Sequence, residues 1–129
     1  MNDITGSYKT CITVRTEYEG FHYYPNAGDI DPRIKFLENE HRHMFKVTAN
    51  IEVFHDDREL EFFLVKWDLN EFIKGGNMNH KSCEMMGREI LEHLKNKWGW
   101  HRWISVTVSE DGESDGTITW FPKASRNVS

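Results

Sequence analysis

The 129-residue sequence contains only two cysteines, Cys11 and Cys83. Two cysteines provide neither a disulfide framework nor a cysteine-rich zinc module. The sequence also lacks an excess of positive charge, since its formal net charge is −5 at pH 7. Because contacts to phosphate groups require a basic surface, this charge argues against nucleic acid as a partner.

Long apolar runs are absent as well, and no stretch approaches the length that spans a membrane. The first seven residues have neither the charged nor the apolar region of a signal peptide, so we expect a soluble, cytoplasmic protein. No internal repeat or low-complexity tract is evident, and the length predicts a single domain over residues 1–129. The 13% of aromatic residues exceeds what such a core needs, which indicates rings at a ligand pocket or an oligomer interface.

Two stretches alternate between apolar and polar residues and predict long, half-buried strands over residues 8–19 and 42–54. Gly20 interrupts the first pattern just before His22, which predicts a bulge or bend at that point. Residues 24–40 contain two prolines, a glycine and many charges, so they are predicted to form a loop. A loop of this length in a small domain is usually functional or partly mobile.

Two helices are predicted in the middle of the chain. The first begins near Phe62 and ends at Gly75, and the second begins after Ser82, a predicted N-cap, and ends at Gly99. Their apolar residues recur at helical spacing. The first helical stripe comprises Phe62, Val65, Leu69, Phe72 and Ile73, and the second comprises Cys83, Met86, Gly87, Ile90, Leu91, Leu94 and Trp98.

The last two predicted strands form a hairpin. Residues 104–110 and 117–121 alternate as strands, and residues 111–116 are predicted to form the turn. The order is strand, strand, helix, helix, strand, strand. It predicts an α+β fold in which two helices cover one face of a four-stranded antiparallel sheet.

Three histidines lie where the two long strands are expected to begin or end. His41 and His43 are separated by one residue, so on a strand they point to the same face, which also carries Phe45. Neutral imidazole is the commonest zinc ligand, and catalytic zinc usually takes three protein ligands and leaves one position open. His22 is the natural third ligand. The alternative is that all three are ordinary polar residues at the end of a loop.

The motifs, in this order, resemble those of the 6-pyruvoyl-tetrahydropterin synthase family, which includes the bacterial 6-carboxytetrahydropterin synthases and has the tunnelling fold (T-fold). The resemblance covers residues 8–121. Five segments carry it, and each matches a family motif: Phe21-His22, His41-Arg42-His43, Leu60-Glu61-Phe62, Ser82-Cys83-Glu84 and Val108-Ser109-Glu110.

The resemblance implies that the three histidines bind Zn²⁺ and that Glu110 anchors a pterin- or purine-like ring, with Cys83 and Glu84 also in the substrate site. It implies a homo-oligomer, a trimer or a hexamer, in which the sheets close into a β-barrel. The activity that it implies is that of a carbon–oxygen lyase on a dihydroneopterin triphosphate-like substrate, in pterin or 7-deazaguanine (queuosine) biosynthesis.

The sequence departs from the family at the proton-transfer groups. The family's cysteine before the histidine pair is missing from residues 34–40, and its Asp-His pair is missing from residues 75–81. Glu38 or Glu40 could replace the cysteine as general base, and His80 could act as the acid. One alternative is a non-catalytic member that binds or sequesters a pterin- or nucleotide-like ligand. Another is a structural protein with an inert histidine cluster.

Overall fold

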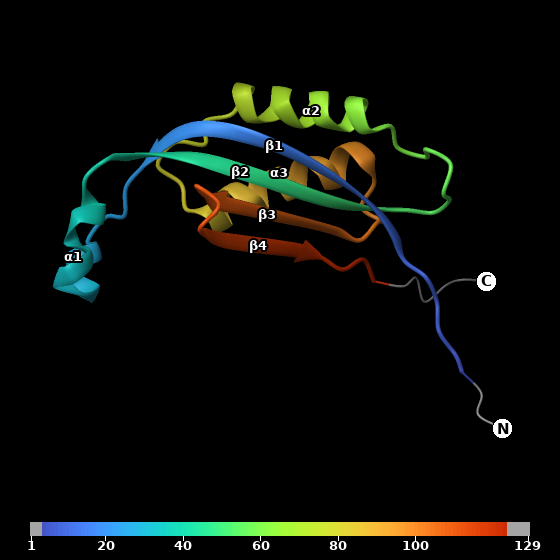
Figure 1. The fold of residues 1–129 in the computed structure, drawn as a ribbon, viewed down its shortest axis with the longest axis horizontal. Coiled ribbons are helices and arrows are strands. Elements are labelled where there is room, and N and C mark those ends of the chain that lie inside the picture. The colour runs from blue at the N-terminus through green and yellow to red at the C-terminus, as the bar shows by residue number, and fades with distance from the viewer. Residues whose placement is uncertain (1–3, 124–129) are drawn as a thin grey trace.

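The computed structural model describes residues 4–123, which form one antiparallel sheet with helices packed against it (Figure 1). The strands lie in the order β1-β2-β3-β4 within the sheet, the same order as in the sequence. The elements are β1 (Thr10–His22), α1 (Ala27–Ile30), the 3-10 helix η1 (Pro32–Glu38), β2 (His41–Val53), α2 (Phe62–Gly75), α3 (Cys83–Trp98), β3 (Ile104–Glu110) and β4 (Ser114–Trp120).

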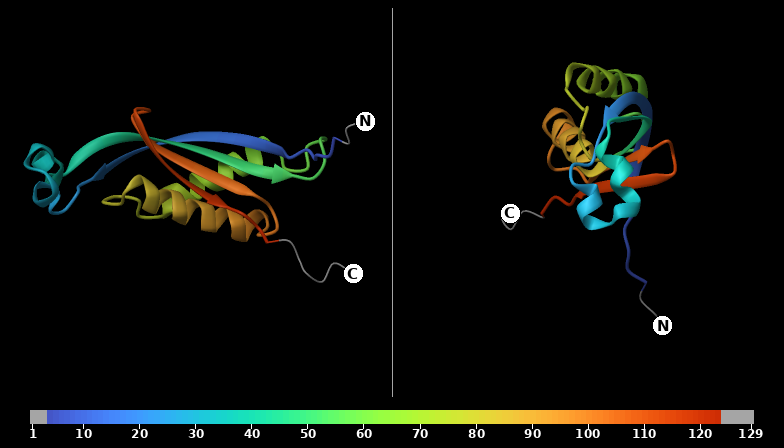
Figure 2. Two further views of the ribbon diagram at one scale, coloured as in Figure 1. Left: turned by 90° about the horizontal axis from the view of Figure 1, so that it is seen from below. Right: turned by 90° about the vertical axis from the view of Figure 1, so that its left-hand side faces the viewer.

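Helices α2 and α3 lie on the same face of the sheet, with α3 against β3 and β4 and α2 against β1 (Figure 2). The core between these layers contains the apolar faces of the strands and one stripe of each helix, as the hydrophobic effect requires. The predicted stripe of α3 is confirmed, whereas that of α2 is confirmed only in part because Phe62 is exposed. Fully buried core residues include Phe45, Ile51, Leu69, Met86, Ile90 and Leu94.

The helix boundaries follow from local capping. The Ser82 hydroxyl accepts a hydrogen bond from the Met85 N–H at 3.1 Å, so the predicted N-cap of α3 is confirmed. The Glu61 carboxylate caps α2 in the same way, by accepting from the Leu64 N–H. Gly99 ends α3 with a φ of 126°, a conformation that side chains disfavour.

Of the bulge or bend predicted at Gly20, the bulge is wrong. β1 pairs with β2 without interruption up to His22, which lies opposite His41, and Gly20 lies opposite His43. A Cβ atom at position 20 would lie 2.6 Å from Cε1 of Tyr18 and 3.2 Å from Cε2 of Phe45. The glycine therefore makes room for two core rings, and the strand continues through it.

Two further local predictions are corrected by the structure. Residues 24–40, predicted to be a loop, contain α1 and η1, and η1 begins where Pro32 follows an Asp31 carboxylate that accepts from the Arg33 N–H. Both elements are too short to show the long periodic pattern by which a helix is predicted from sequence. The turn predicted over residues 111–116 is shorter, because β4 already begins at Ser114.

None of the helices within residues 4–123 combines the length and the apolar character that crossing a membrane requires. The sheet face opposite the helices carries polar side chains, since the strands alternate between the core and the outside. Arg15, Glu17 and Lys46 lie exposed on that face. The sheet therefore separates an apolar helix-covered side from a polar open side.

Candidate metal and ligand site

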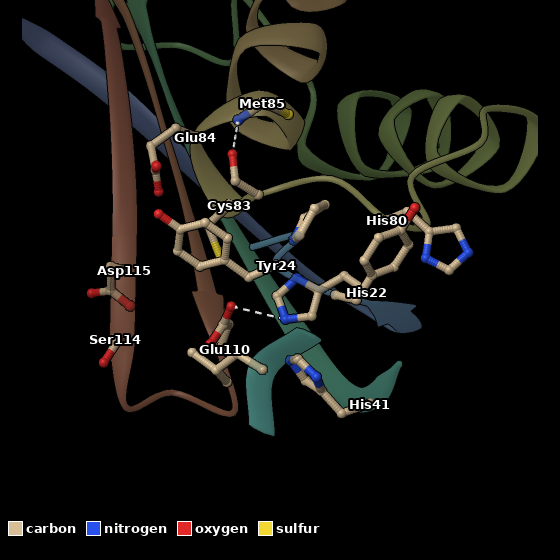
Figure 3. A pocket seen from close by; sticks show the side chains of 14 residues that line it. His22, Tyr24, His41, His80, Cys83, Glu84, Met85, Glu110, Ser114 and Asp115 are labelled. Atoms are coloured by element: carbon tan, nitrogen blue, oxygen red, sulfur yellow. Dashed lines mark hydrogen bonds and ion pairs between the residues drawn. The ribbon is translucent and has the colours of Figure 1, made fainter. Parts of the chain in front are cut away.

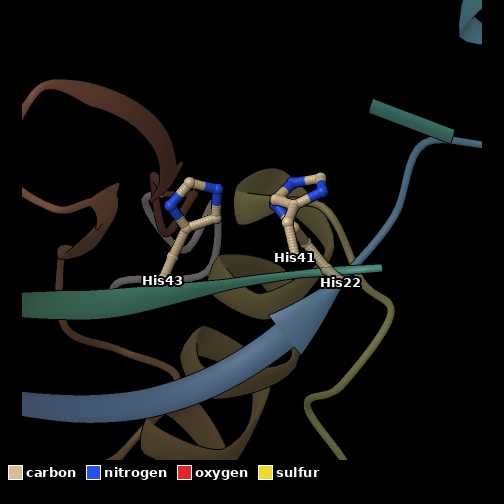
Figure 4. A group of neighbouring side chains, drawn as sticks. All are labelled: His22, His41 and His43. Atoms are coloured by element: carbon tan, nitrogen blue, oxygen red, sulfur yellow. The ribbon is translucent and has the colours of Figure 1, made fainter. Parts of the chain in front are cut away.

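His22, His41 and His43 form a compact cluster at the end of β1 and the start of β2 (Figure 4). Direct pairing of His22 with His41, and the two-residue step from His41 to His43, place all three on the face that carries Phe45. One ligand atom of each histidine lies within 4.8 Å of those of the other two. Their ring centroids are 4.5 to 5.0 Å apart. The structure therefore brings together the three residues that the sequence proposed as metal ligands.

Each imidazole is held from outside the cluster through its Nδ1 atom. His22 Nδ1 lies 3.2 Å from the Lys81 carbonyl oxygen, and His41 Nδ1 lies 2.8 Å from the Asn39 carbonyl oxygen. His43 Nδ1 lies 2.6 Å from a carboxylate oxygen of the residue after Glu110. Carbonyl and carboxylate oxygens only accept hydrogen bonds, so each Nδ1 carries the proton in the neutral ring and each Nε2 keeps a lone pair.

These partners fit a metal centre. Metal-ligating histidines characteristically donate their second N–H to a carbonyl or carboxylate oxygen, which fixes the ring and its tautomer. Burial also lowers the pKa of His22 below its usual value, which favours the neutral imidazole that a metal requires. Three neutral nitrogen donors can hold a Zn²⁺ ion and leave one position free.

The histidine cluster opens into a cavity of about 540 Å³ (Figure 3). This volume suits a small-molecule ligand with one or two fused rings. The cavity lies between the end of β1, the start of β2, the start of α3 and the β3–β4 hairpin. Its lining residues are His22, Tyr23, Tyr24, Pro25, Leu37, His41, His80, Ser82, Cys83, Glu84, Met85, Glu110, Ser114 and Asp115.

Glu110, the predicted ring anchor, lies at the boundary between the cavity and the histidines. Its Oε1 is 3.2 Å from His22 Nε2, and its Oε2 is 3.8 Å from His43 Nε2. With both Nδ1 atoms protonated, the Nε2 lone pairs and the carboxylate face one another as electron-pair donors. Such an arrangement is satisfied by a cation or a proton between them.

Cys83 and Glu84, the other predicted substrate contacts, line the same cavity from the first turn of α3. Burial is the main cause that raises the pKa of the Cys83 thiol to about 12, and Glu110 and Glu84 add to it. Glu84 lies close to β4 because position 116 is glycine. A Cβ atom at Gly116 would lie 2.7 Å from Glu84 Oε1 and 3.1 Å from its backbone nitrogen.

The linker between α2 and α3 is hydrogen-bonded along the end of β1. The Tyr18 hydroxyl donates to the Asn79 side-chain oxygen at 2.8 Å, and the His80 N–H donates to the Phe21 carbonyl at the same distance. His80 adopts a φ of 65°, so its backbone is in the left-handed region. These contacts place the His80 side chain at the rim of the cavity.

His80 and Glu40, two of the three predicted proton-transfer residues, contact each other. His80 Nε2 lies 3.2 Å from Glu40 Oε2, and the ring packs against Tyr23 at a centroid distance of 4.8 Å. Glu38 lies elsewhere. Its carboxylate accepts a hydrogen bond from the Gly28 N–H at 2.8 Å, and it is not among the residues that line the cavity.

Several residues of this site were missed at the level of sequence, among them Asp111 and Tyr24. Asp111, read only as part of a turn, contacts His43, and Tyr24, read as part of a loop, reaches across the cavity in Figure 3. An acidic residue directly after Glu110 was the available signal for Asp111. For Tyr24 the signal was a pair of tyrosines, Tyr23 and Tyr24, directly after His22.

No known family model matches the sequence, and no curated protein matches it. Among solved structures, the chain is similar to 6-pyruvoyl tetrahydropterin synthase of Caenorhabditis elegans. The TM-score is 0.64 at 11% sequence identity, and the match covers 89% of this chain and 98% of that chain. At this identity the likeness shows the fold. The predicted α+β fold class, a four-stranded antiparallel sheet with two helices on one face as in the T-fold, is confirmed.

Proposed function

We propose that this protein is a zinc-dependent lyase of the 6-pyruvoyl-tetrahydropterin or 6-carboxytetrahydropterin synthase type, with the cytoplasm as its location. Its proposed substrate resembles dihydroneopterin triphosphate, in pterin or 7-deazaguanine biosynthesis. One observation carries the proposal: three outward-anchored histidines form one cluster with the Glu110 carboxylate beside it, and Glu110, His22 and His41 line one cavity. The likeness in fold to a 6-pyruvoyl tetrahydropterin synthase supports it.

Ring binding is assigned to the carboxylates of the cavity. A carboxylate has two oxygens, so Glu110 can accept from a ring N–H and a neighbouring exocyclic amine at once. Glu84 lies on the opposite wall, at the start of α3, and offers further acceptors. The protonated Cys83 thiol is a neutral, weakly polar contact between these two carboxylates.

The metal is assigned to His22, His41 and His43, whose Nε2 atoms keep their lone pairs. When bound, the zinc ion acts as a Lewis acid toward hydroxyl and carbonyl oxygens of a ligand. The proximity of Glu110 to His22 lets one small molecule reach both the ring anchor and the metal ligands. The cavity walls exclude part of the water from this region, which strengthens electrostatic interactions there.

Proton transfer is assigned to His80 and Glu40. The Glu40 carboxylate contacts Nε2 of His80, which leaves Nδ1 of the ring for a substrate proton. An adjacent carboxylate stabilises the imidazolium that forms when the ring takes up a proton. The pair thus combines a group that exchanges protons with one that orients it. His80 lies at the rim of the cavity, and Glu40 is not among the residues that line it.

We further propose a homo-oligomer, a trimer or hexamer, in which sheets join edge to edge into a barrel. β1 and β4 are the edge strands of the sheet, and β1 has 13 residues. A long free edge exposes unpaired backbone groups, and barrel closure removes it. The polar open face of the sheet, with Arg15 and Lys46, suits a water-filled barrel interior. A monomer in multi-angle light scattering would refute the barrel.

The second candidate is a protein that binds or sequesters the ligand without turnover. The lack of an ionised cysteine in the site favours it. Residues 34–40 contain no cysteine, and the Cys83 thiol in the cavity has a pKa of about 12. No thiolate base is therefore available in the cavity at neutral pH. The two candidates share the metal and ring sites and differ only in turnover.

The test combines elemental analysis of protein purified without added zinc with a turnover assay on dihydroneopterin triphosphate. The lyase requires about one zinc per chain and product formation that the substitution His80→Gln lowers by roughly 100-fold or more. His55→Gln is the matched control, because His55 is exposed and is not among the residues that line the cavity. Zinc and ring binding without turnover would establish the binder, and a chain without zinc would refute both metal-dependent readings.

A further inference from the structure

The β3–β4 turn carries a residue with an unusual set of contacts. Asp111 and Gly112 have φ angles of 55° and 77°, and the Glu113 N–H donates to the Glu110 carbonyl at 2.9 Å. Positive φ at both central residues is the signature of a type I′ turn, for which Asp-Gly is a preferred pair. The turn therefore places Asp111 directly after the proposed ring anchor, in a fixed backbone conformation.

Asp111 joins this turn to β2 through three hydrogen bonds. Its N–H donates to the Met44 carbonyl at 2.8 Å, and its Oδ1 accepts from the Met44 N–H at 2.8 Å. Its Oδ2 lies 2.6 Å from Nδ1 of His43. The backbone of Asp111 and one of its carboxylate oxygens are thus held by a strand, and the second oxygen is aimed at one imidazole.

His43 differs in this respect from the other two histidines. His22 and His41 are oriented by backbone carbonyls, which every sequence supplies, whereas His43 depends on one side chain. A carboxylate also makes the ring more electron-rich than a carbonyl does, which strengthens Nε2 as a donor. Substitution at position 111 can therefore change which ring nitrogen of His43 carries the proton, and leave the other two histidines in place.

We propose that Asp111 is a positioning residue of the metal centre, which holds the proton of His43 on Nδ1 and so presents Nε2 as the ligand nitrogen. This inference rests on the metal centre of the proposed function. The backbone link from Asp111 to Glu110 adds a consequence, because the same turn fixes both the metal ligand and the ring anchor. Asp111 itself is not among the residues that line the cavity.

The substitution Asp111→Asn tests this role with little change of shape. Asparagine adopts the left-handed conformation readily, and its oxygen can still accept from the Met44 N–H. Its amide nitrogen then faces His43 Nδ1 and donates, which moves the ring proton to Nε2. In competition with a chromophoric chelator, we expect the variant to bind Zn²⁺ about 10- to 100-fold more weakly than the wild type.

Two further variants sharpen the experiment. Glu113→Gln makes the same carboxylate-to-amide change in the same turn, on an exposed side chain, and should leave zinc affinity unchanged. Asp111→Gly keeps the positive φ and removes the side chain, so it should also lose affinity. Circular dichroism and thermal unfolding of each variant report whether the fold is intact.

A readout without metal separates this inference from the proposed function. In chelator-treated protein at about pH 8, the ¹⁵N chemical shifts of His43 report which ring nitrogen carries the proton. We expect Nδ1–H in the wild type and Nε2–H in Asp111→Asn. The inference is overturned if the two folded proteins share one tautomer and one zinc affinity.

The outcomes for the proposed function are distinct. A wild-type chain that binds zinc but does not convert dihydroneopterin triphosphate refutes the lyase and leaves the role of Asp111 intact. A wild-type chain that binds no Zn²⁺ refutes the metal centre, and with it the positioning role, whatever the tautomer of His43.

Discussion

Nε2 of His22 lies 3.2 Å from Oε1 of Glu110, so side chains from the last residues of β1 and β3 meet across β2. This distance links the two parts of the site, the imidazole cluster and the carboxylate that we propose as the ring anchor. Both groups protrude from strand ends beyond the helix-covered core, where Phe45 is the last fully buried ring beneath them.

Replacing His41 with alanine should remove most of the bound zinc. The change deletes one of three nitrogen donors, and the two that remain hold Zn²⁺ far more weakly. Zinc per chain, measured by elemental analysis after gel filtration, should fall from about one to well below half. His55→Ala is the control, and equal zinc in the two variants would reject the cluster as the site.

The substitution Glu110→Gln should weaken binding of a pterin- or guanine-like ring about 10- to 100-fold. The amide has one acceptor oxygen and no charge, so the paired, charge-assisted hydrogen bonds of a carboxylate are lost. Isothermal titration of a reduced pterin into the zinc-loaded protein measures the effect. Glu113→Gln serves as control, and unchanged affinity in Glu110→Gln would remove this residue as the ring anchor.

Cys83 should resist alkylation although it borders the cavity. A pKa of about 12 leaves only roughly one thiolate in ten thousand at pH 8, and the thiolate is the reactive form. The C11S variant, in which Cys83 is the remaining cysteine, should therefore react with iodoacetamide at least several-fold more slowly than C83S. Mass spectrometry over time follows both. Faster labelling of C11S would contradict the assigned protonation state of Cys83.

Acid should destabilise the protein partly through Glu59. Its hydrogen bond to Arg102, at 2.6 Å, is the main cause that lowers the pKa of Glu59 below the usual value of 4.5. The unfolded chain then takes up this proton before the folded chain does, so the stabilisation is present above about pH 4.5 and is lost as the pH falls further.

The substitution Glu59→Gln should therefore cost about 1–2 kcal/mol at pH 7 and much less at pH 3, as urea unfolding measures. The exposed Glu92, which pairs with Lys95, gives the control, and Glu92→Gln should change stability little at either pH. A cost for Glu59→Gln that does not depend on pH would show that its charge is not the stabilising feature.

The parts of the fold that depend on periodicity were predictable from sequence. Alternation over residues 42–54 and the helical stripe from Met86 to Leu94 are local consequences of one buried face, and both are confirmed. Gly20 shows the limit of such reasoning, because its role depends on the rings of Tyr18 and Phe45 beside it. A glycine that breaks a pattern and a glycine that makes room look the same in a sequence.

The candidate site, like the fold, has parts that local sequence patterns predict and parts that depend on tertiary contacts. The convergence of His41 and His43 follows from a two-residue step on one strand, and the register of β1 brings His22 to them. Contacts between distant segments could not be foreseen. The pairing of His80 with Glu40 requires the α2–α3 linker to lie along the end of β1, and no local pattern specifies that path.

Because His22 and His41 lie directly opposite each other, the geometry of the cluster depends on the register of β1 against β2. If β1 slipped by one residue against β2, its side chains would exchange faces, and His22 would point away from the other two imidazoles. A chain with that error could remain compact, since both strands are long, yet its three nitrogens would no longer converge. The amount of metal bound per chain would then report the fraction of molecules in which β1 and β2 have the correct register. A value below one per chain would reflect misaligned strands as well as weak metal affinity.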